Sequence, residues 1–210
     1  MNTTQQTKIK FCGLTRSEDI RIANALRPDF IGFVFAPQSR RYVPPEQAAI
    51  LKDMLDPSIR SVGVFVRETP EQIAALLRAG IIDIAQLHGG ESEEDIRALR
   101  TLTDRPVIKA FRIDSEADLP AVIRSTADFV LLDSGAGGTG TVFDWHTADS
   151  LRRPYFLAGG LTPENVGDAV RRLHPYAVDV SSGIETDGIK DPLKMTAFLQ
   201  HARHAAKKST

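Results

Sequence analysis

The sequence has little cysteine and no long apolar run. A single cysteine among 210 residues excludes a disulfide within the chain and favours a reducing compartment. No apolar stretch reaches the roughly 18 residues that a membrane-spanning helix requires. The first seven residues are polar and lack the charged and apolar regions of a signal peptide. We therefore expect a cytoplasmic protein with no membrane partner.

The sequence also lacks an excess of charge of either sign. Its 26 basic residues nearly balance its 27 acidic residues, which gives a formal net charge of −1. Interleaved charges argue against nucleic-acid binding and against a polybasic membrane-binding surface. The five histidines form no metal-binding motif. We expect neither a nucleic-acid partner nor a metal ion.

What the sequence does contain is a repeat of short β-branched and aromatic runs, about 22 to 30 residues apart. We predict eight strands, over Lys8–Cys12, Phe30–Phe35, Ser61–Phe65, Ile84–Leu87, Val107–Ala110, Phe129–Leu132, Tyr155–Ala158 and Ala177–Val180. Helical spacing of apolar residues predicts helices over Ser17–Leu26, Pro45–Leu55, Thr69–Ala79, Ser92–Leu102, Thr162–Leu173 and Pro192–Lys207. The patterns around Ser115–Ser125 and Trp145–Leu151 are weaker.

The alternation of strands and helices implies parallel strand pairing, because each connection must travel back along the sheet. Eight strand–helix units favour an α/β fold of the closed (β/α)8 TIM barrel type, with an open doubly wound sheet as the alternative. No linker or low-complexity segment interrupts the repeat. We predict one barrel domain over residues 8–207, preceded by a flexible polar N-terminus over residues 1–7.

Glycine and polar residues collect directly after the predicted strands. In a TIM barrel the active site lies at the C-terminal ends of the strands, where the following loops converge. Gly159 and Gly160 follow the seventh strand, and Ser182 and Gly183 follow the eighth. The loops at these two positions often bind phosphate through backbone N–H groups. Ordinary turn glycines are the alternative, but two adjacent loops of this kind favour a phosphorylated ligand.

Three reactive side chains also follow strands. Cys12 ends the first strand; a lone cysteine is more often a small buried apolar residue, but at a barrel mouth beside a helix N-terminus it is a candidate thiolate. Asp133 follows the sixth strand, where its carboxyl either caps a turn or serves as a general acid. Arg41, in the loop after the second strand, is either a solvated charge or a ligand for a substrate carboxylate.

The glycine-rich segment Gly135–Gly140 fits the dinucleotide-binding pattern G-x-G-x-x-G. It follows the sixth strand instead of the first, and no acidic residue ends the next strand to hold a ribose. No P-loop motif is present either. We predict a mobile loop that could fold over a ligand, and no cofactor.

A series of short motifs runs along the chain: Lys10–Thr15, Gly32–Phe35, Ser39–Tyr42, Val62–Val66, Gln86–Gly89, Leu131–Ser134, Gly137–Gly140, Phe143–Trp145, Ala158–Leu161 and Asp179–Glu185. In this order they resemble the phosphoribosylanthranilate isomerase family of tryptophan biosynthesis. The resemblance covers residues 8 to about 200, and related phosphate-binding barrels lack its Cys-Gly start. It implies a TIM barrel of the ribulose-phosphate-binding type.

The resemblance implies an isomerase that converts N-(5′-phosphoribosyl)anthranilate into 1-(2-carboxyphenylamino)-1-deoxyribulose 5-phosphate by an Amadori rearrangement. Asp133 would be the general acid that opens the furanose ring, and Cys12 the general base that removes the C2′ proton. Arg41 would pair with the anthranilate carboxylate. The implied substrate-binding residues are Arg41, Gly159, Gly160, Asp179, Ser182 and Gly183, of which Gly159, Gly160, Ser182 and Gly183 would hold the phosphate. The family needs no cofactor and no metal, and we expect a monomer or a homodimer.

A thiolate base works near neutral pH only if the pKa of Cys12 lies below the usual value of about 8.5. The position of Cys12 beside the start of the first predicted helix supplies a reason for such a lowering.

Two alternatives stay open. The first is a related sugar-phosphate barrel. An epimerase of this kind would need metal-ligating histidines with paired acids, and an isomerase of the histidine pathway would need an aspartate where Cys12 stands. A barrel that only binds a phosphorylated metabolite or a partner protein would keep the glycine loops, without a reason to keep Cys12 and Asp133 together.

Overall fold

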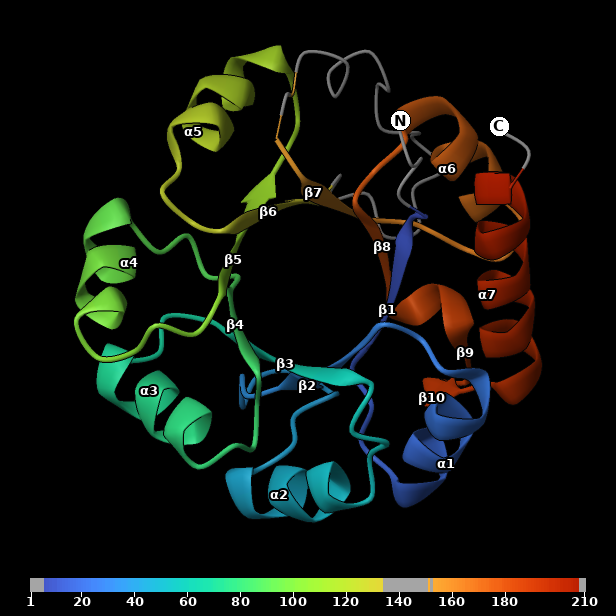
Figure 1. Cartoon of the computed structure of the whole chain (residues 1–210), viewed down its shortest axis with the longest axis horizontal. Coiled ribbons are helices and arrows are strands. Elements are labelled where there is room, and N and C mark those ends of the chain that lie inside the picture. Colours follow the sequence, from blue (N-terminus) through green and yellow to red (C-terminus); the bar gives the residue numbers. More distant parts are fainter. Residues whose placement is uncertain (1–5, 134–150, 152, 208–210) are drawn as a thin grey trace.

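The computed structural model of the chain describes residues 6–133, 151 and 153–207. Within them, eight parallel strands close into a barrel in sequence order (Figure 1). The strands are β1 (Lys8–Cys12), β2 (Phe30–Val34), β3 (Arg60–Phe65), β4 (Ile84–Leu87), β5 (Val107–Arg112), β6 (Phe129–Asp133), β7 (Tyr155–Ala158) and β8 (Ala177–Val180). The predicted TIM barrel is confirmed, and the open doubly wound sheet is excluded.

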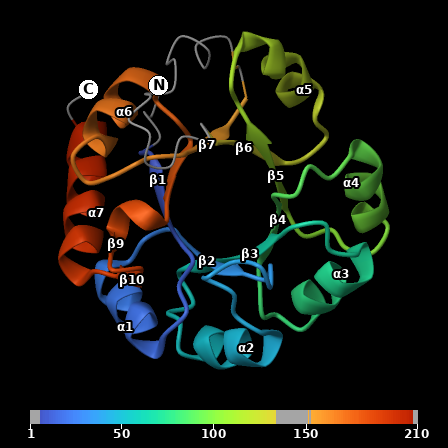
Figure 2. The ribbon, with the colours of Figure 1, turned by 180° about the vertical axis from the view of Figure 1, so that it is seen from behind.

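Helices surround the barrel, as the views from its two ends show (Figure 1, Figure 2). They are α1 (Ser17–Leu26), α2 (Pro45–Asp53), α3 (Pro70–Arg78), α4 (Glu93–Arg100), α5 (Leu119–Arg124), α6 (Val166–Leu173) and α7 (Pro192–Lys207), with single 3-10 turns at η1 (Glu116–Asp118) and η3 (Ser182–Ile184). The weak pattern around Ser115–Ser125 thus becomes η1 and α5. The segment Gly135–Gly140 lies outside the described residues. So does Trp145–Leu151, except for its last residue, Leu151. No helix in the described ranges is both long enough and apolar enough to cross a membrane.

Alternating side chains along the strands divide the apolar core into two clusters. The smaller cluster fills the barrel interior and includes Phe30, Ile84, Ile108, Leu131 and Phe156. The larger cluster lies between the strands and the helices and includes Ile9, Phe33, Leu51, Val130 and Phe198. Since every second residue of a strand shares a face, the strand register decides which polar side chains point into the barrel.

The helix α6 begins at Val166, later than the predicted start at Thr162. The intervening turn is fastened by Asn165, whose side chain accepts a hydrogen bond from Thr162 N at 2.8 Å and donates one to Gly160 O at 2.9 Å. The asparagine therefore fixes the glycine loop after β7 to the start of α6.

A short hairpin that the sequence did not predict follows η3. It pairs β9 (Glu185–Thr186) with β10 (Ile189–Lys190) in antiparallel fashion. Its turn needs two residues of positive φ, which are Asp187 at 53° and Gly188 at 78°. The hairpin carries Glu185 and Lys190 to the end of the barrel where β1 and β8 finish.

Candidate active site

Cys12 and Asp133 lie at the same mouth of the barrel and both face its interior. Asp133 stands two positions beyond Leu131, which belongs to the interior cluster. Cys12 is the Cα partner of Gly32 on β2, which stands two positions beyond interior Phe30. Because β1 and β6 are parallel members of one closed barrel, their C-terminal ends open on the same side.

The thiol of Cys12 is buried, with 9% of the residue exposed. Burial raises the pKa of this thiol, and the positive charges of Lys10 and Lys190 act in the opposite direction. The negative charge of Asp179 adds to the rise. Burial is the largest of these effects, because it removes water from the charged form of the sulfur.

The helix N-terminus, which the sequence offered as a reason for a lowered Cys12 pKa, is therefore outweighed by burial. It is the N-terminus of α1, and the N–H groups that lead into this helix have a partner of their own. Thr15 N and Arg16 N both donate to Oδ2 of Asp19, at 3.0 and 3.1 Å. The negative charge of the Asp19 carboxylate therefore compensates the positive N-terminal end of the α1 dipole.

Lys10 and Asp179 form an ion pair inside the barrel. The two residues are Cα partners on β1 and β8, and Lys10 Nζ lies 2.9 Å from Asp179 Oδ2. The Lys10 side chain is fully buried and that of Asp179 is 7% exposed. Within the described residues, the other oxygen, Asp179 Oδ1, is buried without a hydrogen-bond partner. An unsatisfied buried acceptor costs about 1–3 kcal/mol, so Oδ1 is a ready acceptor for a ligand hydroxyl.

Asp133 contacts a histidine that directly follows β4. His88 Nε2 lies 3.3 Å from Asp133 Oδ2, and both side chains are about one-third exposed. On its other side, the His88 ring is held by Gln86, whose Nε2 lies 3.0 Å from His88 Nδ1. In the tautomer whose Nδ1 accepts a hydrogen bond from the Gln86 amide, the ring proton lies on Nε2 and points at Asp133.

Arg41 is held by a carboxylate from the β9–β10 hairpin. Its Nε and Nη2 donate to the two oxygens of Glu185, at 2.7 and 2.6 Å. Lys190 Nζ donates to the same carboxylate at 2.5 Å. Burial works against the charge of Glu185, but the hydrogen bonds from Arg41 and Lys190 outweigh it and hold the Glu185 pKa below its usual value. The sequence assigned the Arg41 guanidinium to a substrate carboxylate. Its Nε and Nη2 atoms already form a bidentate contact with Glu185.

The glycine-containing loops after β7 and β8 are in close contact with each other. A Cβ on Gly183 would lie 1.9 Å from the carbonyl oxygen of Leu161, so only glycine permits this approach. Gly159 and Gly160 have φ values of 89° and 63°, in the left-handed region that favours glycine. No hydrogen bond within the described part of the chain uses the N–H groups of Gly160, Ser182 or Gly183. Such free N–H groups in converging loops suit an anion.

Sequence reasoning missed four residues of this site: Lys10, His88, Glu185 and Lys190. Two of them carried a local signal: Lys10 lies two positions before Cys12 on an apolar strand and must share its face, and His88 directly follows the fourth strand, where the active site of a barrel is expected. Glu185 and Lys190 become relevant only through contacts across the fold. Among the described residues, no group of three or more His, Cys, Asp or Glu side chains is arranged to hold a metal ion.

Comparison with known proteins gives one consistent result. A family model described as N-(5′-phosphoribosyl)anthranilate (PRA) isomerase matches residues 9–201. The N-(5′-phosphoribosyl)anthranilate isomerase of Endomicrobium trichonymphae is 44% identical over 200 residues, which cover 93% of this chain and 98% of the relative. The protein of the same name from Acetivibrio thermocellus is 42% identical over 212 residues, covering 95% of this chain and 97% of the relative.

Solved structures agree with the sequence relatives. The phosphoribosyl anthranilate isomerase of Thermotoga maritima superposes with a TM-score of 0.87 at 36% identity, covering 95% of this chain and all of that one. The Thermus thermophilus enzyme gives a TM-score of 0.83 at 37% identity, over 93% and 98% of the two chains. A further structure of this isomerase, in complex with reduced 1-(o-carboxyphenylamino)-1-deoxyribulose 5-phosphate, gives 0.84 at 36% identity, over 95% and 100%.

Proposed function

The chain belongs to the N-(5′-phosphoribosyl)anthranilate isomerase family, and we propose that it uses Asp133 as the general acid and Cys12 as the general base. It is an isomerase of tryptophan biosynthesis that forms 1-(2-carboxyphenylamino)-1-deoxyribulose 5-phosphate. The observation that carries the assignment of roles is the inward placement of a buried thiol and a partly exposed carboxyl at one barrel mouth.

The reaction begins with opening of the furanose ring. Asp133 donates its proton to the ring oxygen, the bond from that oxygen to C1′ breaks, and a Schiff base forms between C1′ and the anthranilate nitrogen. The carboxylate left on Asp133 then faces the N–H group of His88, with Nε2 3.3 Å from Oδ2. A donor already aimed at the site of developing charge stabilises that charge without reorganising.

Proton abstraction follows at C2′. The Cys12 thiolate removes this proton, and the electron pair moves into the Schiff base to give an enolamine. The enolamine takes up a proton at C1′ and loses one from the C2′ hydroxyl, which gives the ketone, so no proton is gained or lost overall. A positioned acid or base contributes roughly 10²-fold to 10⁴-fold to such a step.

The remaining groups of the mouth fit the two anionic ends of the substrate. We assign the phosphate to the backbone N–H groups of Gly159, Gly160, Ser182 and Gly183, because the loops that carry them converge. Asp179 Oδ1 would accept a hydrogen bond from a sugar hydroxyl.

We assign the anthranilate carboxylate to Arg41. Its Nε and Nη2 are held by Glu185, which leaves the Nη1 edge of the guanidinium for the substrate. Glu185 then serves to fix the direction of that edge.

A genetic test addresses the whole assignment. A bacterial strain that lacks its own phosphoribosylanthranilate isomerase requires tryptophan, and we expect this chain to restore growth without it. Cys12→Ala and Asp133→Asn should abolish the rescue while the protein accumulates to the same level. Failure of the unaltered chain to restore growth, when it is made in soluble form, contradicts the proposed function.

Two further properties belong to the same proposal. We expect the enzyme to work in the cytoplasm, where a reducing environment keeps the Cys12 thiol free. We also expect a monomer or a homodimer, and light scattering of the purified protein distinguishes the chain mass of 23.0 kDa from twice that value. One structurally similar isomerase, from Thermotoga maritima, is described as dimeric.

A further inference from the structure

Two buried lysines act on the Cys12 thiol, Lys10 from the barrel strand β1 and Lys190 from the hairpin strand β10, and each pairs with a carboxylate. Lys10 is fully buried and pairs with Asp179 at 2.9 Å. Lys190 is 3% exposed and pairs with Glu185 at 2.5 Å. A buried lysine and carboxylate are expensive to desolvate, and two apolar side chains of similar volume would often be as stable or more stable. Stability alone therefore does not explain why both pairs lie here.

The position of Lys10 sets it apart from Lys190. It lies on β1, two residues before Cys12, so its side chain leaves the strand on the same face as the thiol. Its ammonium is confined there by Asp179 from the neighbouring strand β8. Lys190 instead lies on the hairpin strand β10 and makes three contacts of its own, to Glu185 and to the carbonyl and hydroxyl oxygens of Ser181.

We propose that Lys10 is a positioning residue for the isomerase reaction, whose fixed positive charge keeps the buried thiol of Cys12 available as a thiolate. Asp179 holds the ammonium in place, and its Oδ1, which has no hydrogen-bond partner among the described residues, can accept one from the substrate. The inference rests on the proposed function, since it takes Cys12 to be the base. Burial raises the pKa of the thiol, and among the groups that lower it the charge of Lys10 acts most strongly.

Other charges near the thiol act on its pKa less strongly than Lys10 does. The charges that act on Cys12 come from β1, β8, β10 and the loop after β2, and they belong to Lys10, Asp179, Lys190 and Arg41. Glu185 on β9 pairs with both Lys190 and Arg41, so its single negative charge offsets one of their two positive charges. The Asp179 charge opposes that of Lys10, but it is the smaller of the two effects on the thiol. Removal of Lys10 should therefore leave the thiolate less stable.

The single cysteine of the chain makes a direct test available. The ultraviolet absorbance of the thiolate is followed against pH, and the same titration of Cys12→Ala is subtracted, so the difference reports Cys12 alone. In Lys10→Met we expect the midpoint to rise by about one pH unit or more. At neutral pH, kcat/KM should fall about tenfold for each unit of that rise.

A matched control comes from the same strand. Lys8 also pairs with an aspartate, Asp29 at 2.8 Å, but it lies at the opposite end of β1 from the thiol. Lys8→Met loses the same kind of ion pair and should leave the Cys12 midpoint unchanged. Equal shifts in Lys8→Met and Lys10→Met would mean a general effect on the barrel and would overturn the proposal.

A second variant keeps the test decisive if Lys10→Met does not fold, because that variant leaves Asp179 buried alone. The double variant Lys10→Met with Asp179→Asn removes both charges, and its midpoint should still lie above that of the unaltered protein. A midpoint unchanged in every folded Lys10 variant overturns the role of Lys10, and the base assignment of Cys12 stands if Cys12→Ala is inactive. Normal turnover of Cys12→Ala would instead refute the proposed function, whatever Lys10 does to the thiol.

Discussion

His88 and Asp133 meet at the mouth of the barrel, with His88 Nε2 3.3 Å from Asp133 Oδ2. The histidine comes from the end of β4 and the aspartate from the end of β6. Gln86, two residues earlier on β4, fixes the ring by its contact with Nδ1 at 3.0 Å. The carboxyl that we assign as the general acid is thus oriented by a side chain whose own orientation is fixed.

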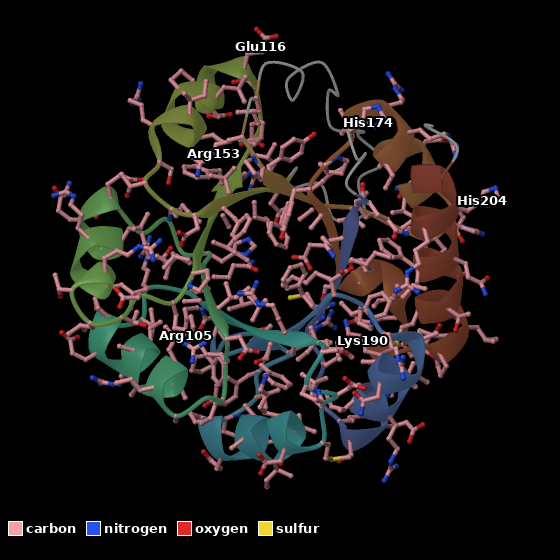
Figure 3. All side chains as sticks on the ribbon, viewed as in Figure 1. Arg105, Glu116, Arg153, His174, Lys190 and His204 are labelled. Atoms are coloured by element: carbon pink, nitrogen blue, oxygen red, sulfur yellow. The ribbon has the colours of Figure 1, made fainter. Side chains whose placement is uncertain are left out.

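Loss of this orientation should slow the reaction without weakening substrate binding. We expect His88→Ala to lower kcat by about 10-fold to 100-fold, the cost of a misplaced catalytic group, and to change KM little. His204→Ala is the matched control, because His204 is exposed on the outer helix α7 (Figure 3). Steady-state kinetics of the two variants decide the matter. A normal kcat for His88→Ala would remove His88 from the site.

Arg41 should act on binding and not on chemistry. A charge-assisted hydrogen bond contributes about 1.5–3 kcal/mol, so Arg41→Ala should raise KM roughly 10-fold to 100-fold and leave kcat nearly unchanged. Glu185 keeps Lys190 as a partner in this variant, so the loop after β8 should stay folded. The exposed neighbour Arg40 provides the control in Arg40→Ala. A fall in kcat at constant KM would place Arg41 in the chemical step.

Gly32 leaves room for the thiol. A Cβ at this position would lie 2.8 Å from Cys12 Sγ and 3.2 Å from Cys12 Cα. We expect Gly32→Ala to displace the thiol, to lower kcat at least tenfold, and to cost about 1–3 kcal/mol in the free energy of unfolding. In Gly167→Ala the new methyl group has no contact closer than 3.4 Å, and a helical alanine should leave both quantities unchanged or raise stability slightly. Kinetics and urea unfolding of both variants test this contrast.

Glu91 should stabilise the loops around the mouth in a pH-dependent way. It accepts hydrogen bonds from Arg67 N and Gly89 N, both at 2.8 Å, and pairs with Lys109 at 3.2 Å. Burial opposes the charge of Glu91, but these backbone hydrogen bonds outweigh it and hold its pKa below the usual value. Its stabilising effect is therefore complete above the unfolded pKa of about 4.3 and is lost as the pH falls through the lower folded value.

We expect Glu91→Gln to cost about 3 kcal/mol at pH 7, because Lys109 is left buried without its charge partner. The difference from the unaltered protein should shrink as the pH falls below about 4, toward the lowered pKa of folded Glu91. Urea unfolding at the two pH values measures it. Glu116→Gln is the control, since Glu116 is exposed on η1 at the rim of the molecule (Figure 3). A difference that does not change with pH contradicts this account of Glu91.

The fold could be predicted because its signals are local. The run Ile84–Leu87 is apolar and bounded by turn residues, and it forms a strand over the predicted residues. The regular spacing of such runs then indicates the barrel, since eight strand–helix units have few ways to bury their apolar faces. The placement of Cys12 and Asp133 at one mouth follows from the same reasoning.

The contacts within the site could not be predicted in this way. Arg41 and Glu185 are 144 residues apart, and Lys10 and Asp179 are 169 residues apart, so each pair depends on how β1, β2 and β8 align. The upward direction of the Cys12 pKa could not be read from the sequence for the same reason. A helix N-terminus nearby is visible in the sequence, whereas the burial of the thiol and the carboxylate of Asp19 on that helix are properties of the folded chain.

The most direct test of the central claim is the loss of fluorescence of freshly made phosphoribosylanthranilate in the presence of the purified protein. We predict a loss well above the buffer rate, and a kcat lower by roughly 10²-fold to 10⁴-fold in each of Cys12→Ala and Asp133→Asn. Substrate loss at the buffer rate with the unaltered protein would contradict the isomerase function. Near-normal turnover in either variant would contradict the acid and base roles of these two residues.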